Sequence, residues 1–352
     1  MERTPFLYHK LAAAGARFGE FQGLETAAAF GDVTREFRAL SSSCAVFDLA
    51  WRVHFEATGE DRVRWLNGMV TNNVRDLAPD RGAYAFLLNP QGRILGDLTI
   101  FNLGNSLLLE TDVAQVEKLR QTFDKYIIMD DVELGPVAPR NAIGLAGPDS
   151  AIVLESCGLA AADLDLLQMR EFPERKLTVV RGERRNVPLF EVLFDPSGAP
   201  SAWDALVAAG AVPVGFEALE KWRVAMGIPR YGQDIRERDL PQETEQSHAL
   251  HFTKGCYVGQ EIVERIRSRG QVHRKFTGFV LAGSAPTPGA KVQAGGKEVG
   301  EITSVATLPG ANGSTATVAL GYIRREAGAP GATVQVDGAE AAVADFPYLV
   351  VR

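Results

Sequence analysis

The sequence has few of the residues from which metal centres and disulfide frameworks are built. Among its 352 residues are five histidines and three cysteines, Cys44, Cys157 and Cys256, and no two cysteines form a CxxC pair. An odd number of widely spaced cysteines argues against a disulfide framework and an all-cysteine zinc site, and it is typical of a reducing compartment. We therefore expect a cytoplasmic protein without a bound metal.

Long apolar runs and an excess of positive charge are also missing. No segment approaches the ~18 consecutive apolar residues that a membrane-spanning helix needs. His9, Lys10 and Arg17 interrupt the first residues, so we expect no signal peptide. A formal net charge of −7 makes general binding to nucleic acid or to an anionic membrane unfavourable. The hydrophobic fraction of 46% is sufficient for a sizeable core.

The common nucleotide-binding and hydrolase motifs are absent as well. There is no GxGxxG segment that opens a helix after a strand, no GxSxG elbow and no HExxH pair. Strand and helix patterns alternate irregularly in residues 1–275, which favours an α+β fold over a doubly wound sheet. The spacing predicts helices at 58–70 and 217–226, the first with a capping-box start at Thr58.

The composition changes near residue 276. Beyond it, short β-type runs alternate with turns such as Pro309-Gly310, which is typical of a small barrel or sandwich. The expected strands are 276–281, 290–293, 299–305, 315–323 and 341–346. We therefore expect a C-terminal β-barrel at 276–352, after a region at 1–275 that contains two α+β subdomains.

A predicted hairpin in the larger region carries one notable acid. Residues 83–88 and 94–101 predict two strands joined by the turn at 89–92. Alternation in the second strand predicts one face with Leu95, Asp97, Thr99 and Phe101 and an opposite face with Ile94, Leu98 and Ile100. A carboxylate on a half-buried face needs a partner, which is either a donor group of a ligand or an arginine.

The densest chemical segment is the octapeptide Lys254-Gly-Cys-Tyr-Val-Gly-Gln-Glu261. From Gly259 onward the pattern predicts a helix, so Cys256 lies just ahead of a helix N-terminus and two residues from Lys254. The helix dipole and a nearby cation both favour thiolate over thiol. Cys256 is therefore a candidate reactive or ligand-contacting residue, and the alternative is a small buried cysteine in a tight turn.

Two further features flank this octapeptide. His248 and His251 are metal ligands only if distant carboxylates complete the site, and partly buried or surface histidines are the alternative. One basic cluster follows in an otherwise acidic protein, and it either engages a polyanion such as RNA phosphate or forms a solvated helix face. The members of this cluster are Arg265, Arg267, Arg269, His273, Arg274 and Lys275.

The octapeptide resembles the K-G-C-[FY]-x-G-Q-E signature of the YgfZ family of folate-binding proteins. Over nearly the whole chain, the sequence is also similar to the glycine-cleavage T-protein, a tetrahydrofolate-dependent aminomethyltransferase. The matching segments include 15–18, 45–49, 71–74, 88–92, 223–234, 300–304 and 320–323.

The resemblance implies three subdomains in a ring around a central folate-binding channel, with tetrahydrofolate as the cofactor. It also implies an accessory role in assembling or maintaining iron–sulfur clusters in client enzymes, including radical tRNA-modifying enzymes, with a possible weak tRNA contact through the basic cluster. The residues expected to do the chemistry are Cys256, Lys254, Gln260 and Glu261, with the thiol at the mouth of the folate cavity. The residues expected to contact folate are Asp97, Tyr84, Thr111, Arg223 and Arg274.

Departures from the T-protein pattern favour the YgfZ interpretation. Gly96-Asp97 stands where the T-protein has an Asp-Asp pair, and Ala225 replaces the acid that we expect to anchor the pterin. The D-V-S-H-M element reads Asp-Leu-Ala-Trp-Arg at 48–52. We therefore expect aminomethyl transfer to be lost, and folate binding to be weakened unless Glu217, Glu243 or another acid substitutes. A tetrahydrofolate-dependent aminomethyltransferase or demethylase is the alternative.

Overall fold

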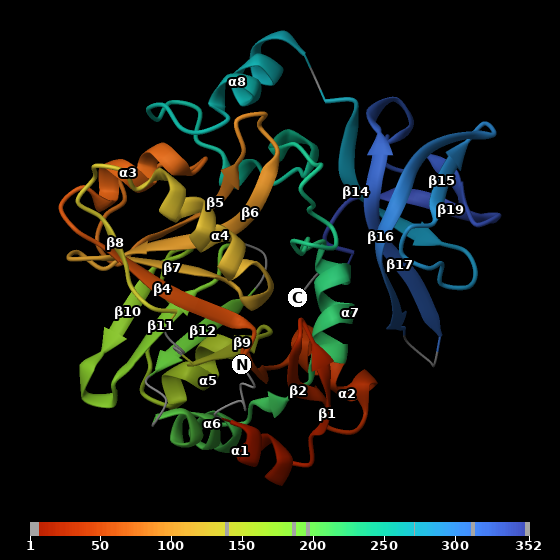
Figure 1. Cartoon of the computed structure of the whole chain (residues 1–352). Helices are drawn as coiled ribbons and strands as arrows, with labels where there is room; N and C mark the ends of the chain where they lie inside the picture. The colour runs from red at the N-terminus through yellow and green to blue at the C-terminus, as the bar shows by residue number, and fades with distance from the viewer. Residues whose placement is uncertain are drawn as a thin grey trace.

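The computed structural model describes residues 7–137, 141–184, 188–194, 198–270, 272–310 and 314–348. Its strands form a two-stranded ribbon, a six-stranded sheet, a five-stranded sheet and a closed six-stranded barrel. The ribbon consists of β1 (Arg17–Phe21) and β2 (Leu24–Ala29). The sheets, the ribbon and the barrel are arranged around helix α7 (Phe216–Met226), which stands between the barrel and the rest of the molecule (Figure 1).

The six-stranded sheet brings together distant parts of the chain. In spatial order its strands are β10 (Met169–Phe172), β11 (Leu177–Arg181), β12 (Leu189–Phe194), β9 (Asn141–Ala146), β3 (Ala45–Asp48) and β13 (Val212–Pro213). Three helices cover one face: α1 (Tyr8–Ala13), α5 (Ser150–Ser156) and α6 (Ala199–Ala208). On the other face, Phe47 packs with residues of α2 (Val33–Ser42) and of α7.

The five-stranded sheet carries the predicted hairpin. Its order is β5 (Gly82–Leu88), β6 (Ile94–Asn102), β7 (Leu107–Asp112), β4 (Arg52–Thr58) and β8 (Glu133–Leu134). Helices α3 (Arg62–Met69) and α4 (Val113–Tyr126) bury Leu66, Leu119 and Phe123 against one face of this sheet. Several polar side chains of β4, β6 and β7 line the cavity described below, namely Arg52, Asp97, Thr99, Glu110 and Asp112.

The C-terminal barrel confirms the predicted all-β unit and, with the mixed sheets, the α+β fold. Its strands, in order around the barrel, are β14 (Arg274–Leu281), β17 (Thr315–Arg324), β16 (Lys297–Pro309), β15 (Lys291–Ala294), β18 (Thr333–Val336) and β19 (Ala339–Ala344), and β19 closes onto β14. Strand β18 was not predicted from the sequence pattern. This strand alternates buried Val334 and Val336 with exposed residues, but it spans only four residues.

Two local predictions were wrong. Thr58 ends strand β4 rather than capping a helix, because α3 begins at Arg62 and the carboxylate of Asp61 accepts a bond of 3.0 Å from the backbone N–H of Asp131. In β6 a bulge pairs Leu88 with Ile94 and Leu87 with Gly96. Leu95 therefore packs with the core beneath the sheet instead of sharing the face of Asp97.

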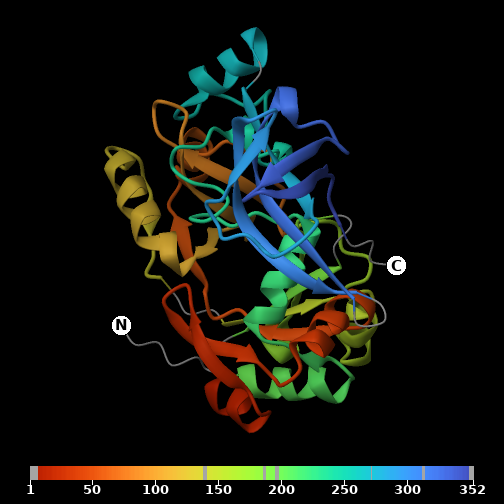
Figure 2. The same ribbon diagram turned by 90° about the vertical axis from the view of Figure 1, so that its right-hand side faces the viewer.

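Between α7 and the barrel lie the 3-10 turns η3 (Pro241–Glu243) and η4 (Ser247–Ala249) and the helix α8 (Gln260–Arg269). Two further 3-10 turns join neighbouring strands: η1 (Pro173–Arg175) lies between β10 and β11, and η6 (Arg325–Ala327) lies between β17 and β18. Both views place α8 at one end of the molecule, above the five-stranded sheet (Figures 1 and 2). No helix within the described ranges combines the length and apolar composition required to cross a membrane.

Helix α7 attaches to the barrel through a buried ion pair. The Arg223 guanidinium donates to Asp234 at 2.6 Å and to the hydroxyl of Ser304 in β16 at 2.9 Å. Asp234 is fully buried and also accepts from Thr303 and Ser304. Arg223 therefore holds together the helix, the loop after it and the barrel.

Replacing this arginine should weaken the fold. We expect Arg223→Met to lower the free energy of unfolding by about 3–5 kcal/mol, because the fully buried Asp234 loses its cation. Urea unfolding followed by circular dichroism measures the effect, with Arg38→Met on the exposed side of α2 as the control. A change as small in the Arg223 variant as in the control would contradict this account of barrel docking.

Candidate functional site

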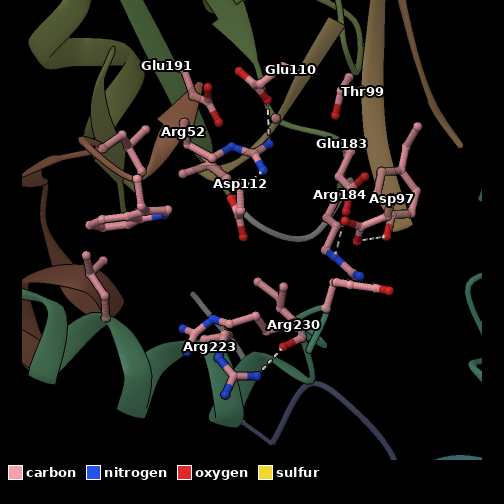
Figure 3. A pocket seen from close by; sticks show the side chains of 18 of the residues that line it. Arg52, Asp97, Thr99, Glu110, Asp112, Glu183, Arg184, Glu191, Arg223 and Arg230 are labelled. Atoms are coloured by element: carbon pink, nitrogen blue, oxygen red, sulfur yellow. Dashed lines mark hydrogen bonds and ion pairs between the residues drawn. The ribbon is translucent and has the colours of Figure 1, made fainter. Parts of the chain in front are cut away.

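A cavity of about 240 Å³ lies between the two large sheets and α7. Strands β3 to β7, β11 and β12 supply one wall, and α7 with the loop at 228–231 supplies the other. Figure 3 shows acidic side chains from the strands facing Arg223 and Arg230 from the helical side. None of the lining residues belongs to the barrel, which lies behind α7.

Two of the predicted folate-contacting residues, Asp97 and Tyr84, lie together in this cavity. The Tyr84 hydroxyl donates to one carboxylate oxygen of Asp97 at 2.6 Å, and the Gln115 amide donates to the other at 2.6 Å. The Thr111 hydroxyl donates to the backbone carbonyl of Asp97 at 2.8 Å. Thr111 therefore supports the strand from a fully buried position and does not line the cavity.

The environment of Asp97 makes ionisation of its carboxyl less favourable than in water. Burial raises the pKa of this carboxyl, and the hydrogen bonds from Tyr84 and Gln115 offset only part of that effect. Burial and the nearby Asp97 charge in turn raise the pKa of Tyr84 well above its usual value. The sequence pattern predicted that the partner of Asp97 is either a donor group of a ligand or an arginine. Among the described residues, its bonded partners are a phenol and an amide instead.

Gly96 faces α4 rather than the cavity. A Cβ at this position would lie 2.7 Å from Leu119 Cδ2 and 2.8 Å from Gln115 Oε1. A carboxylate here would therefore point away from the cavity, and it would displace the glutamine that holds Asp97. Gly96 therefore gives no support to the expected loss of aminomethyl transfer. The neighbouring position that faces the cavity, Asp97, is still an aspartate.

A second acidic group in the cavity wall was missed by the sequence analysis. Arg52 donates to Asp112 at 3.0 Å and also contacts Glu110 (Figure 3). The other carboxylate oxygen of Glu110 lies 2.9 Å from His54 Nε2. Burial raises the pKa of Glu110, but Arg52 and His54 outweigh it and lower the pKa overall. Burial and the neighbouring Glu110 charge raise the pKa of Glu191 strongly, so the two carboxyls are shifted in opposite directions.

Glu217 and Glu243, the two acids suggested as substitutes for the one missing at position 225, do not line the cavity. Glu217 pairs with Arg17 at 2.8 Å on the surface, and Glu243 pairs with Arg274 at 2.9 Å. Ala225 itself is fully buried in the core between α7 and the barrel. The acids that do line the cavity are Asp97, Glu110, Asp112, Glu183, Glu191 and Glu220.

The two predicted arginines have mainly structural partners. Arg223 reaches the cavity wall, but its guanidinium is engaged with Asp234 and Ser304. Arg274 lies outside the cavity and bridges Asp239 at 2.7 Å and Glu243. Neither guanidinium is therefore placed to contact a ligand in the cavity without giving up these bonds.

The octapeptide loop lies near the tip of the β5–β6 hairpin. The Lys254 ammonium is buried and donates to the carbonyls of Asn67, Val70 and Asn72 at 2.5, 2.6 and 2.7 Å, so it caps the C-terminal end of α3. At Gly259, with φ of 82°, a Cβ would lie 2.6 Å from the carbonyl oxygen of Asn89. These contacts fix the loop between α3 and the hairpin.

Cys256 is exposed and does not line the cavity. The expectation of a thiol at the cavity mouth is therefore wrong. Lys254 directs its three N–H groups to carbonyl oxygens, which leaves none to donate to the thiolate. Gln260 and Glu261 begin α8, which follows Cys256 as predicted.

The two histidines that flank the octapeptide have different neighbours, and so do members of the basic cluster. His248 stacks on Tyr84 with ring centroids 5.4 Å apart, whereas His251 lines a separate groove beside Lys254. Arg267 covers the ring of Phe252, and Arg274 belongs to the ion pairs described above. The side chain of Arg269 lies outside the described residues.

Comparison with known proteins assigns the chain to a family. Residues 7–254 match the family model of the GCVT N-terminal domain, and residues 274–347 match that of the glycine cleavage T-protein C-terminal barrel domain. The chain belongs to the glycine-cleavage T-protein family.

Relatives and a solved structure extend along most of the chain. An aminomethyltransferase of Rubrobacter xylanophilus is 30% identical over 88% of this chain and 84% of its own length. One from Thermus thermophilus is 29% identical over the full length of both chains. The crystal structure of glycine cleavage system aminomethyltransferase T from Bartonella henselae superposes with a TM-score of 0.89 at 22% identity, covering 100% of this chain and 99% of that one. This superposition confirms the fold.

The raised pKa of Asp97 leads to a pH-dependent prediction. The folded protein binds the Asp97 proton more tightly than the unfolded chain, so this group's contribution to stability is lost as pH rises through its folded pKa. We therefore expect Asp97→Asn to gain stability relative to wild type at about pH 8, and to lose that gain towards about pH 4, near the ordinary aspartate pKa.

Unfolding midpoints of both proteins across this range measure the effect. Asp345→Asn, at an exposed position, serves as the control. A difference between Asp97→Asn and wild type that stays constant with pH would contradict the assignment of a raised pKa to Asp97.

Proposed function

We propose that the protein binds tetrahydrofolate in the central cavity and acts, through the Cys256 thiol, as an accessory factor that assembles or maintains iron–sulfur clusters in client enzymes. The observation that carries this proposal is the octapeptide loop, whose backbone is fixed by Lys254 and Gly259 while Cys256 stays exposed. The loop resembles the signature of the YgfZ family, and an exposed thiol can be reached by a protein client. Family membership supports the folate part.

The cavity offers polar atoms that a pterin would satisfy. The buried atoms Glu191 Oε2 and Trp222 Nε1 have no hydrogen-bond partner in the described part of the chain, and both residues line the cavity. Each such atom costs about 1–3 kcal/mol while it is unpaired. A pterin presents N–H donors along a guanidine-like edge and acceptors on its ring, so it fits both.

The chain's own residues would orient this ligand. Tyr84 and Gln115 hold the Asp97 carboxyl toward the cavity, and Arg52 holds Glu110 and Asp112, so the polar wall is ordered before binding. Glu183 adds a further carboxylate, which faces His248 at 3.5 Å. Bound tetrahydrofolate would supply a carrier for one-carbon units.

Aminomethyl transfer to tetrahydrofolate is the second candidate, and Asp97 favours it. A buried carboxyl with a raised pKa can hold or release a proton at an amine of the substrate. Relatives over most of the chain are named aminomethyltransferases. Turnover of the aminomethyl intermediate of glycine cleavage by the purified protein would select this function.

Genetic rescue tests the role of the thiol. In a strain without the gene, we expect Cys256→Ser to restore iron–sulfur enzyme activities about tenfold less well than wild type, because an alcohol is not a thiolate nucleophile or metal ligand at neutral pH. Cys157→Ser, at a partly exposed cysteine outside the loop, should rescue fully. Full rescue by Cys256→Ser would disprove the accessory role of this residue.

A further inference from the structure

A polar groove of about 320 Å³ lies beside the Cys256 loop and shares no lining residue with the central cavity. Its wall includes Asn73, Arg75, Asp76, His251 and Thr253, together with Lys254. Gly255 also lines it, so Cys256 follows the groove directly in the chain. The groove has no part in the binding of a ligand in the central cavity.

Arg75 and Asp76 are the exposed charged residues of this groove, whereas the Lys254 ammonium is turned to backbone carbonyls. The guanidinium of Arg75 lies 3.7 Å from where a Cβ on Gly255 would be, and no carboxylate within the described ranges forms an ion pair with it. Burial, followed by the Arg75 charge, lowers the pKa of Lys254 to about 7. The two positive groups therefore oppose each other. The one acid, Asp76, accepts a hydrogen bond from the Asn73 amide at 2.7 Å.

The neighbouring surface differs from this groove in its charge pairing. Arg64 on α3 pairs with Asp61 and Asp130, and Arg267 on α8 lies 3.5 Å from Glu264. Arg75, in contrast, is an exposed arginine without an ion-pair partner in the described part of the chain. In addition, the Nδ1 atom of His251 is buried and has no hydrogen-bond partner among the described residues.

An oxyanion would satisfy this arrangement. A guanidinium fork binds carboxylate and phosphate oxygens through two parallel N–H donors. A negative group beside Arg75 would also offset the repulsion between Arg75 and Lys254. The Thr253 hydroxyl and the Asn73 amide add neutral polar groups to the wall.

We propose that this groove is a subsite for the oxyanion group, a carboxylate or a phosphate, of the molecule that meets the Cys256 thiol. The role of this subsite rests on the proposed function of Cys256. The binding of an anion in the groove does not depend on that function. The substrate class of the thiol is then an acidic molecule rather than a neutral one.

Alkylation of the thiol tests the subsite without any client enzyme. Iodoacetate and iodoacetamide both react by attack of the thiolate on carbon: a C–S bond forms, the C–I bond breaks, iodide leaves and the thiol proton goes to solvent. Only iodoacetate carries a carboxylate. The rate ratio of iodoacetate to iodoacetamide at Cys256 therefore reports the attraction of the carboxylate to the groove, and mass spectrometry of the Cys256 peptide measures it. Cys157 is not a cation-free reference, because the Arg175 guanidinium contacts its backbone carbonyl.

Two variants make this test specific. Arg75→Gln should lower the Cys256 ratio about fivefold, whereas Arg265→Gln, at an exposed arginine on α8 outside the groove, should leave it unchanged. Added inorganic phosphate or acetate should slow the iodoacetate reaction at Cys256, and the stronger inhibitor identifies the preferred oxyanion.

An unchanged Cys256 ratio in Arg75→Gln, or equal losses in both arginine variants, would overturn the proposal, as would inhibition by neither anion. None of these outcomes changes the expectation for rescue by Cys256→Ser, so failure of the subsite is distinct from failure of the thiol's role.

Discussion

The hydrogen bonds that hold the Asp97 carboxyl in the cavity couple three parts of the fold. Gln115 reaches Asp97 from α4 because Gly96 leaves space for it, and Tyr84 reaches the same carboxyl from the neighbouring strand. Helix packing, strand pairing and the acidic wall therefore depend on one another. A buried acid of this kind is stable only with donors around it, and the fold supplies them before any ligand arrives.

The β5–β6 hairpin links the two candidate functional regions. Its strands carry Tyr84 and Asp97 into the cavity, and its turn packs against the loop of Cys256, where Gly92 lies against Ile262 and Gly259 lies against Asn89. Lys254 fixes the same loop to the end of α3. The thiol thus lies outside the cavity, but its loop packs against the β5–β6 hairpin, which forms part of the cavity wall.

Local periodicity predicted the hairpin, the helix after Cys256 and most of the barrel, because these features depend on residues close in sequence. It could not predict the group formed by Arg52, Glu110 and Glu191, since β4, β7 and β12 meet only in the folded sheets. Lys254 was misjudged for the same reason: it is two residues from Cys256, yet its ammonium bonds a helix end almost two hundred residues earlier. The bulge in β6 places Leu95 on the face opposite to Asp97, and simple alternation of residues does not predict a bulge.

Equilibrium titration of the purified protein with tetrahydrofolate tests the central claim most directly, namely that the cavity around Asp97 holds this ligand. The account predicts saturable binding at one site per chain. It further predicts that Asp97→Ala weakens the affinity by about tenfold or more, whereas Glu217→Ala, at a surface ion pair outside the cavity, leaves the affinity unchanged. Absence of binding to the wild-type protein, or equal affinity of wild type and Asp97→Ala, would contradict it.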